Sequence, residues 1–125
     1  MENLTDTNKA NKKFNKEIKS GTAALALLGV LSQAAEPMYG YQIAKHIEAS
    51  SNDVTLIKQG ALYPVLRSLE SSGLLESQVE PSISGPPRRY YRITESGREA
   101  LGEWTKIWIQ TKDFVDAILE GARND

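Results

Sequence analysis

The chain contains no cysteine and only one histidine, His46, among its 125 residues. The absence of cysteine excludes disulfides, thiolate metal sites and thiol nucleophiles. His46 has no acidic or cysteine motif beside it, and the sequence has no glycine-rich phosphate loop, so nothing indicates catalysis or metal binding. We therefore expect a protein that is not an enzyme and that has no catalytic residue, metal site or cofactor.

Long hydrophobic runs are equally scarce. The longest apolar-rich run covers residues 23–31, which are too few to cross a bilayer, and no signal peptide is recognisable. The sequence therefore predicts a cytoplasmic protein without a membrane partner. A chain of this length that is 40% hydrophobic can form one domain with a modest core, which association with a second subunit would enlarge.

Neither sign of charge predominates, since the formal net charge is -1 at pH 7. Residues 1–98 hold 12 Lys or Arg against 10 Asp or Glu, whereas residues 99–125 hold 3 against 6. This small basic excess is too weak for indiscriminate binding to polyanions. DNA binding would therefore require a local basic surface.

The strongest pattern in the chain is a helix followed directly by a basic hairpin. Apolar residues spaced 3, 1 and 3 apart form one face of the helix, and polar residues spaced 4, 4 and 3 apart form the other. After Gly73, runs at 74–79 and 88–93 flank a loop rich in Ser, Gly and Pro and predict two antiparallel strands. The apolar face comprises Leu62, Val65, Leu66 and Leu69, and the polar face comprises Gln59, Tyr63, Arg67 and Glu70.

A helix that can enter a DNA groove, followed by a basic hairpin, is the arrangement of a winged helix-turn-helix. We therefore predict a mainly α fold with a small β-hairpin wing. The recognition helix should begin near Lys58 or Gln59, after a turn at 50–53 and a short extended segment at 54–57. The first helix of the helix-turn-helix is predicted at 39–47, after a break at 36–38.

Four segments of the chain resemble the PadR family of bacterial transcription regulators, in the order and spacing of that family. The resemblance covers roughly residues 20–118, and a joint match of four separate motifs is far less open to chance than one short pattern. The segments are Tyr39-Gly40-Tyr41-Gln42-Ile43, Gly60-Ala61-Leu62-Tyr63-Pro64-Val65-Leu66, Leu69-Glu70-Ser71-Ser72-Gly73-Leu74 and Arg88-Arg89-Tyr90-Tyr91-Arg92-Ile93-Thr94-Glu95-Ser96-Gly97.

The resemblance implies a homodimeric regulator that binds operator DNA. With one carboxyl-terminal helix and no second helical domain, the chain is similar to the short PadR subfamily, which includes multidrug-responsive repressors that dimerise through that helix. We therefore expect a repressor that a small planar aromatic or cationic effector releases from DNA. The alternative is a winged-helix module that binds proteins and not DNA, because the net charge is slightly negative.

The predicted DNA-binding residues lie in and just before the recognition helix, on the wing, and at the start of the helix-turn-helix. Arg67 is the best candidate for a phosphate contact, and Gln59 and Ala61 are candidates for base edges. In PadR-like proteins the first aromatic residue of the Tyr-Gly-Tyr motif lies near the DNA backbone, and Tyr39 occupies that place here. For Tyr41, packing against the core is an equal alternative. The full set is Tyr39, Thr55, Lys58, Gln59, Ala61, Tyr63, Arg67, Arg88 and Arg89.

Pro64 lies inside the predicted helix, where proline costs on the order of 3 kcal/mol. The PadR family shares this Leu-Tyr-Pro feature, so we expect a local distortion and not a break.

The wing departs from the family, because many members carry a basic residue between a glycine and the second proline, whereas this chain has Gly85-Pro86-Pro87. This departure predicts weaker wing affinity and a different reach.

The amino-terminal residues 1–19 are polar, carry five lysines and lack a core face. We expect a solvated, partly disordered tail, with a DNA-phosphate arm as the alternative. Ser20 or Thr22 is predicted to cap a buried helix that runs to about residue 36. The predicted divisions are a tail at 1–19, a winged domain at 20–93 and a dimerisation helix at 94–120.

The last predicted helix opens at Thr94, a suitable cap, and carries an apolar heptad seam. A helix of about 25 residues, or roughly 37 Å, is too long for a small winged domain to cover. It should therefore pair with its twin or with the partner's first helix. The predicted dimerisation residues are Leu101, Trp104, Trp108, Val115 and Ile118.

Trp104 and Trp108 lie one turn apart on this seam. They can be dimer core, or they can form a flat aromatic slot in which a planar, cationic compound stacks. By resemblance, Trp108 aligns with the tryptophan that lines the drug pore of multidrug-responsive PadR-like regulators. We therefore predict that Trp104 and Trp108 bind the effector, with dimer core as the alternative.

Overall fold

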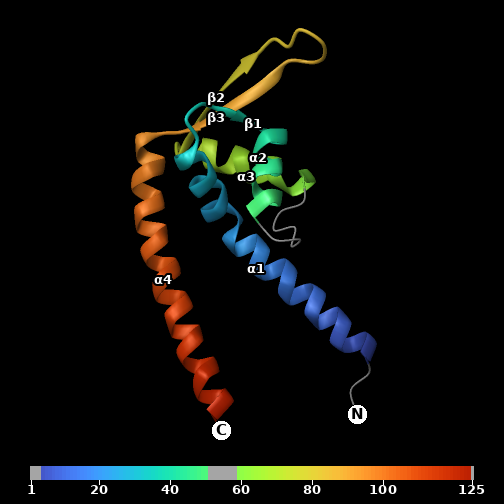
Figure 1. Ribbon diagram of the computed structural model, residues 1–125, viewed down its shortest axis with the longest axis vertical. Helices are drawn as coiled ribbons and strands as arrows, with labels where there is room; N and C mark the ends of the chain where they lie inside the picture. Colours follow the sequence, from blue (N-terminus) through green and yellow to red (C-terminus); the bar gives the residue numbers. More distant parts are fainter. Residues whose placement is uncertain (1–3, 51–58, 125) are drawn as a thin grey trace.

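The computed structural model describes residues 4–50 and 59–124, and of residues 4, 5, 59, 60 and 124 only the backbone. These residues form a winged-helix fold with a three-stranded antiparallel sheet in the order β1-β3-β2. The hairpin projects at one end, while α1 and α4 extend from the sheet and diverge toward the chain ends (Figure 1). The elements are α1 (Leu4–Gln33), β1 (Met38–Tyr39), α2 (Gly40–Ser50), α3 (Gln59–Ser71), β2 (Leu75–Glu80), β3 (Arg88–Ile93) and α4 (Glu95–Asn124).

The first helix is longer than predicted. It begins at Leu4, not at Ser20 or Thr22, and it ends at Gln33. Thr22 is not a cap, because its hydroxyl donates to the carbonyl oxygen of Ile18 at 2.8 Å inside the helix. Residues 6–18 are exposed as expected, but they are helical and not a partly disordered tail. This stretch contains no proline and no glycine, so nothing in it interrupts a helix.

The helix-turn-helix also differs from the prediction at its start. Tyr39 belongs to β1, where it pairs with Tyr90 of β3, and α2 begins only at Gly40. The Tyr39 N–H donates to the Gln42 side-chain oxygen at 3.1 Å, which satisfies a backbone donor at the helix start. A strand of two residues has no alternation that the sequence could reveal. The turn at 51–53 and the extended segment at 54–57 fall outside the described residues.

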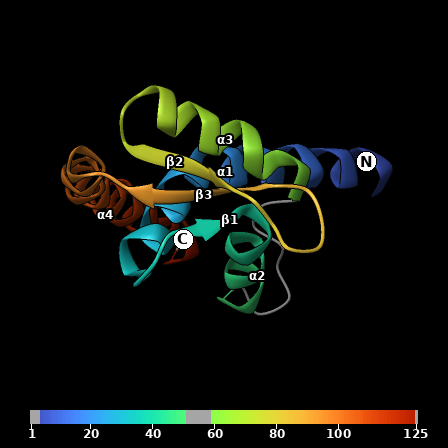
Figure 2. The same cartoon turned by 90° about the horizontal axis from the view of Figure 1, so that it is seen from above.

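The predicted apolar face of the recognition helix is confirmed in α3. Leu62, Leu66 and Leu69 are buried and Val65 is half-buried. The helix is unbroken across Pro64, which is its sixth residue, so the missing N–H removes one hydrogen bond near the helix start. Figure 2 shows α3 beside β2 and α2 near β1. The core comprises Leu27, Leu28, Leu31, Ile43, Ile47, Leu62, Leu66, Leu69, Leu75, Tyr91 and Ile93.

The recognition helix ends in a turn that needs glycine. Gly73 has a φ of 80°, and its N–H donates to the Glu70 carbonyl at 2.9 Å. The Leu74 N–H donates to the Leu69 carbonyl, also at 2.9 Å. This pair of hydrogen bonds is a Schellman motif, in which a left-handed residue stops the helix and turns the chain into the next element. Here the next element is β2.

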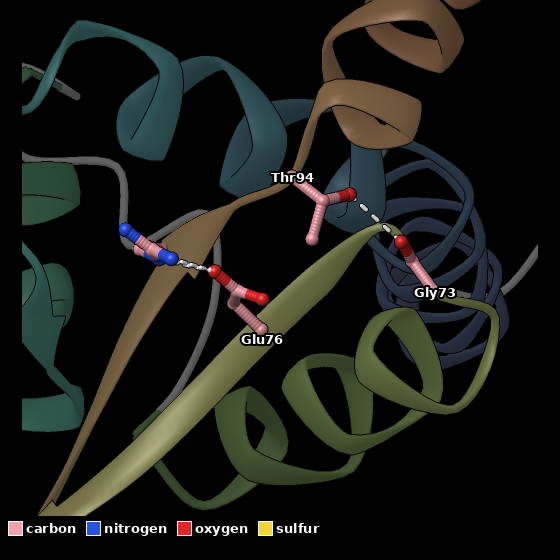
Figure 3. Close-up of polar contacts among 4 residues, drawn as sticks. Gly73, Glu76 and Thr94 are labelled. Carbon is pink, nitrogen blue, oxygen red and sulfur yellow. Dashed lines mark hydrogen bonds and ion pairs between the residues drawn. The ribbon is translucent and has the colours of Figure 1, made fainter.

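The last helix is fastened to that turn by Thr94, the predicted cap. The Thr94 hydroxyl accepts a hydrogen bond from the Gly97 N–H at 3.0 Å, which confirms the cap, and donates to the Gly73 carbonyl at 2.7 Å (Figure 3). The Thr94 N–H donates to the Leu74 carbonyl at 3.1 Å. A Cβ at Gly97 would overlap that same carbonyl oxygen, so glycine allows the close approach. The start of α4 is therefore held at the end of α3.

Replacing Thr94 by valine keeps the side-chain shape but removes the hydroxyl that caps α4 and binds Gly73. We expect Thr94→Val to lower the free energy of unfolding by about 1–2 kcal/mol. Thr94→Ser keeps the hydroxyl and should cost much less. Chemical denaturation followed by circular dichroism, at one fixed protein concentration, measures both variants. Equal losses in the two variants would contradict the role assigned to the hydroxyl.

Candidate nucleic-acid interface

The exposed face of α3 continues into the start of α2 through Tyr63. The Tyr63 side chain is 39% exposed and lies across Gly40, where an added Cβ would be 2.5 Å from the Tyr63 hydroxyl oxygen. A side chain at position 40 would therefore displace Tyr63. Because Tyr39 directly precedes Gly40, the recognition helix and the Tyr-Gly-Tyr motif form one continuous surface.

Tyr39 connects this surface to the wing. Its ring lies nearly parallel to that of Tyr41, with centroids 6.4 Å apart, and meets Tyr90 edge-on at 5.4 Å. The Arg88 guanidinium lies over the Tyr39 ring at 4.4 Å from its centroid. This distance is within the range of a cation–π interaction. Tyr39 thus holds one wing arginine in place.

A second cation, Lys45, was missed by the sequence analysis. Its Nζ lies 5.6 Å from the centroid of the Tyr41 ring, and Tyr41 is 51% exposed. Tyr41 is therefore a surface residue and not part of the core. The spacing of four residues on one helix was the available signal for this pair. The sequence analysis also missed Tyr90, because its ring meets Tyr39 only when β1 pairs with β3.

The opposite face of the hairpin carries the other wing arginine. Arg89 Nη1 donates to the Ser77 hydroxyl at 2.9 Å, and that hydroxyl donates to a Glu70 carboxylate oxygen at 2.6 Å. Burial of the Tyr91 side chain, followed by the nearby Glu70 carboxylate, raises the pKa of Tyr91, while Arg89 and Arg67 lower it. Arg88 and Arg89 therefore lie in different surroundings.

The structure places the remaining predicted contact residues as follows. Ala61 and Arg67 are exposed on α3. Thr55 and Lys58 lie outside the described residues, and Gln59 is described only as part of the α3 backbone. The wing tip at 81–87 has no charged residue, and Ile83 at the tip is fully exposed. The wing tip is therefore uncharged, and the wing's three arginines are all in β3.

A separate apolar groove of about 660 Å³ lies between α1 and α4. Trp108 lines it and is 39% exposed, whereas Trp104 is half-buried and also packs against the core. Lys112 and Asp116, joined by a hydrogen bond of 2.9 Å, provide charge at its edge. The lining residues are Ile18, Gly21, Thr22, Ala24 and Leu25 from α1, and Trp104, Ile107, Trp108, Thr111, Lys112, Val115 and Asp116 from α4.

The rest of α4 exposes large apolar side chains over several turns. Residues 105–123 are all exposed, although α1 faces several of them across the groove. The exposed apolar residues are Ile107, Trp108, Ile109, Phe114, Val115, Ile118 and Leu119. An apolar surface of this extent on a single subunit is typical of a protein–protein interface.

Other kinds of site find no support in the described part of the chain. Over residues 4–50 and 59–124, no three His, Cys, Asp or Glu side chains gather where they could hold a metal ion. No helix within those same ranges is long and apolar enough to span a membrane. The candidate sites are therefore the surface around α3 and the wing, and the groove between α1 and α4.

Comparison with known proteins agrees with this geometry. The profile of the "Transcriptional regulator PadR-like family" matches residues 27–103. The chain is similar to a PadR family transcriptional regulator from Eggerthella lenta, whose crystal structure superposes with a TM-score of 0.75 at 34% identity, covering 93% of this chain and 97% of that chain.

Two relatives are similar in sequence. An uncharacterized protein of Lysinibacillus sphaericus is 36% identical over 83 residues, which are 66% of this chain and 76% of that protein. A transcriptional regulator of Mycobacterium tuberculosis is 47% identical over 47 residues, which are 38% of this chain and 43% of that protein. Because the family profile spans more than half of the chain and the fold agrees over nearly all of it, the chain belongs to the PadR-like family of transcriptional regulators.

Proposed function

We propose that this regulator is a repressor that binds operator DNA as a homodimer, with α3 in the major groove and the wing beside it. The observation that carries the proposal is the continuous surface of Tyr63, Tyr39 and Arg88, which joins the exposed face of α3 to the wing. A phenolic hydroxyl and a guanidinium both donate hydrogen bonds to phosphate oxygens. The surface therefore suits the backbone of a DNA duplex.

The residues on α3 divide by the part of DNA that they suit. Arg67, exposed one turn after Tyr63, would contact a phosphate. Ala61, near the start of the helix, can touch a thymine methyl group, and Gln59 can pair with adenine. Thr55 and Lys58, just before α3, would extend the contact along the backbone.

A second copy of the chain would cover the apolar face of α4. Within the described part of the chain, Ile107, Phe114 and Ile118 are each more than half exposed, so their apolar surface is available to a partner. Pairing through Leu101, Trp104, Trp108, Val115 and Ile118 would bury the heptad seam and place two recognition helices on successive half-sites, about one helical turn of DNA or a multiple apart.

The groove between α1 and α4 supports an effector site. A volume of about 660 Å³ suits a small molecule, and Trp108 offers an aromatic face for a planar compound. Asp116 also lines the groove, but it is paired with Lys112, so a cationic ligand would have to compete with Lys112 for the carboxylate. Because α4 begins against the end of α3, a ligand that changes the angle of α4 would move the recognition helix, and a coupling of ~1–3 kcal/mol suffices for release.

Binding to the DNA upstream of its own gene should depend strongly on salt, because basic side chains displace counterions from phosphates. Arg67→Gln should reduce the magnitude of the slope of log affinity against log salt by about 1.8, because the homodimer would lose two phosphate contacts at about 0.9 each. Lys106→Gln on α4, which breaks an exposed pair with Glu103, is the control and should leave the slope unchanged. Fluorescence anisotropy measures both. A folded dimer without salt-dependent DNA binding would instead favour a protein-interaction module.

Gly40→Ala should weaken operator binding about tenfold, or by ~1.4 kcal/mol, because the new methyl group displaces Tyr63 from the surface. The same substitution in a Tyr63→Ala background should have little further effect, since the colliding side chain is gone. Anisotropy titrations of the four proteins give the coupling between the two positions. Additive losses would mean that Gly40 acts independently of Tyr63.

Planar aromatic cations should quench the tryptophan fluorescence of the dimer saturably and lower its affinity for upstream DNA. Trp108→Ala should abolish the response, because Trp108 is more exposed in the groove than Trp104. Since Trp108 also belongs to the proposed dimer seam, analytical ultracentrifugation first establishes that the variant is still a dimer. A panel of non-intercalating dyes, titrated with and without DNA, provides the test. If no compound quenches and DNA binding is intact, both tryptophans are dimer core only.

A further inference from the structure

Adjacent arginines of the wing, Arg88 and Arg89, lie on opposite faces of the hairpin. They are consecutive residues of β3, and successive side chains of a strand point to opposite sides of a sheet. Arg88 is paired across the hairpin with Glu80, and Arg89 with Val79. Both arginines are exposed, so burial alone does not distinguish them. Their contacts do.

Arg88 is presented to solvent with its hydrogen-bonding groups available. Its guanidinium carbon lies 4.4 Å from the centroid of the Tyr39 ring, and among residues 4–50 and 59–124 the guanidinium has no hydrogen bond or ion pair. This contact fixes the side chain without using its N–H donors. An arginine held in this way is prepared to meet a phosphate.

Arg89, although exposed, has one of its N–H donors engaged by another residue of the protein. The chain of hydrogen bonds runs from Arg89 on β3 to Ser77 on β2 and on to Glu70 in the last turns of α3. Arginine can only donate and a carboxylate can only accept, so the Ser77 hydroxyl has one possible direction in this chain. Both of its hydrogen bonds involve a charged partner, which makes them stronger than neutral ones.

This chain of hydrogen bonds joins the two elements whose relative angle matters for recognition. The wing extends well beyond the helices (Figure 1), so a small rotation at its base displaces its tip by a larger distance. Between α3 and β2 the backbone passes through the Gly73 turn, which orients the hairpin at its base. The contact from Glu70 to Ser77 braces the hairpin further along β2.

We infer that Arg89 is a positioning residue, which holds the wing against the recognition helix through Ser77 and Glu70, and that Arg88 is the wing arginine that contacts DNA phosphate. This inference rests on the proposed operator binding. It assigns different tasks to two neighbouring residues that the sequence presents as equivalent contacts.

The salt dependence of operator binding separates the two roles. Arg88→Gln should lower the magnitude of the slope of log affinity against log salt by about 1.8, because the homodimer would lose two phosphate contacts at about 0.9 each. Arg89→Gln and Ser77→Ala should each weaken binding about threefold to tenfold with an unchanged slope, and the double variant should be no weaker than the weaker single one. Ser77→Thr, which keeps the hydroxyl, should retain wild-type affinity. If Arg89→Gln lowers the slope as Arg88→Gln does and Ser77→Ala is harmless, Arg89 contacts DNA directly and the inference is wrong.

Hydrogen exchange of the hairpin amides, measured without DNA, provides an independent readout. Amides at 75–80 and 88–93 should exchange faster in Arg89→Gln and Ser77→Ala than in the wild type, and should not change in Arg88→Gln. Equal exchange in all variants would overturn the bracing role. If the wild type binds no DNA but the exchange pattern appears, the operator proposal fails while the positioning of the wing by Arg89 stands.

Discussion

The hydroxyl of Thr94 is the contact on which the arrangement of the helices depends. It caps α4 and binds the carbonyl of Gly73 directly behind α3, while its own backbone N–H binds Leu74. Nearby, Arg98 Nη1 donates to the Ser32 carbonyl at 3.4 Å, at the end of α1. Because α4 is one wall of the apolar groove and α3 carries the proposed contacts to DNA, this junction sets the geometry of both sites.

The surface around α3 is assembled by aromatic rings and not by a large excess of positive charge. A chain with a net charge of -1 cannot rely on its overall field to attract DNA. Stacking between Tyr39 and Arg88 instead gathers α2, β1 and β3 into one local surface, and Tyr41 with Lys45 extends it. Cations held on rings lose less freedom when they meet a phosphate than freely moving side chains would.

Much of the fold follows from local patterns that need no partner. Helical spacing identified the buried face of α3, two short runs around a Ser-, Gly- and Pro-rich loop identified the wing, and Thr94 was recognised as a cap. The predicted start of α1 was wrong, because residues 4–19 have no core face that a pattern could reveal, although their composition permits an exposed helix. A two-residue β1 was missed because its existence depends on β3, far along the chain.

The sequence by itself determined which residue types stand on which face of each element, since helical and strand periodicities are properties of neighbouring residues. Helical spacing therefore predicted Tyr63 and Arg67 as surface candidates, and the basic hairpin pattern predicted Arg88 and Arg89, whereas Tyr39 was predicted from the resemblance to the PadR family. Only the tertiary structure decided which of them meet: Tyr63 on Gly40, Arg88 on Tyr39, and Arg89 through Ser77 to Glu70. These contacts join residues on different elements, so they depend on strand register and helix packing, which no local pattern encodes.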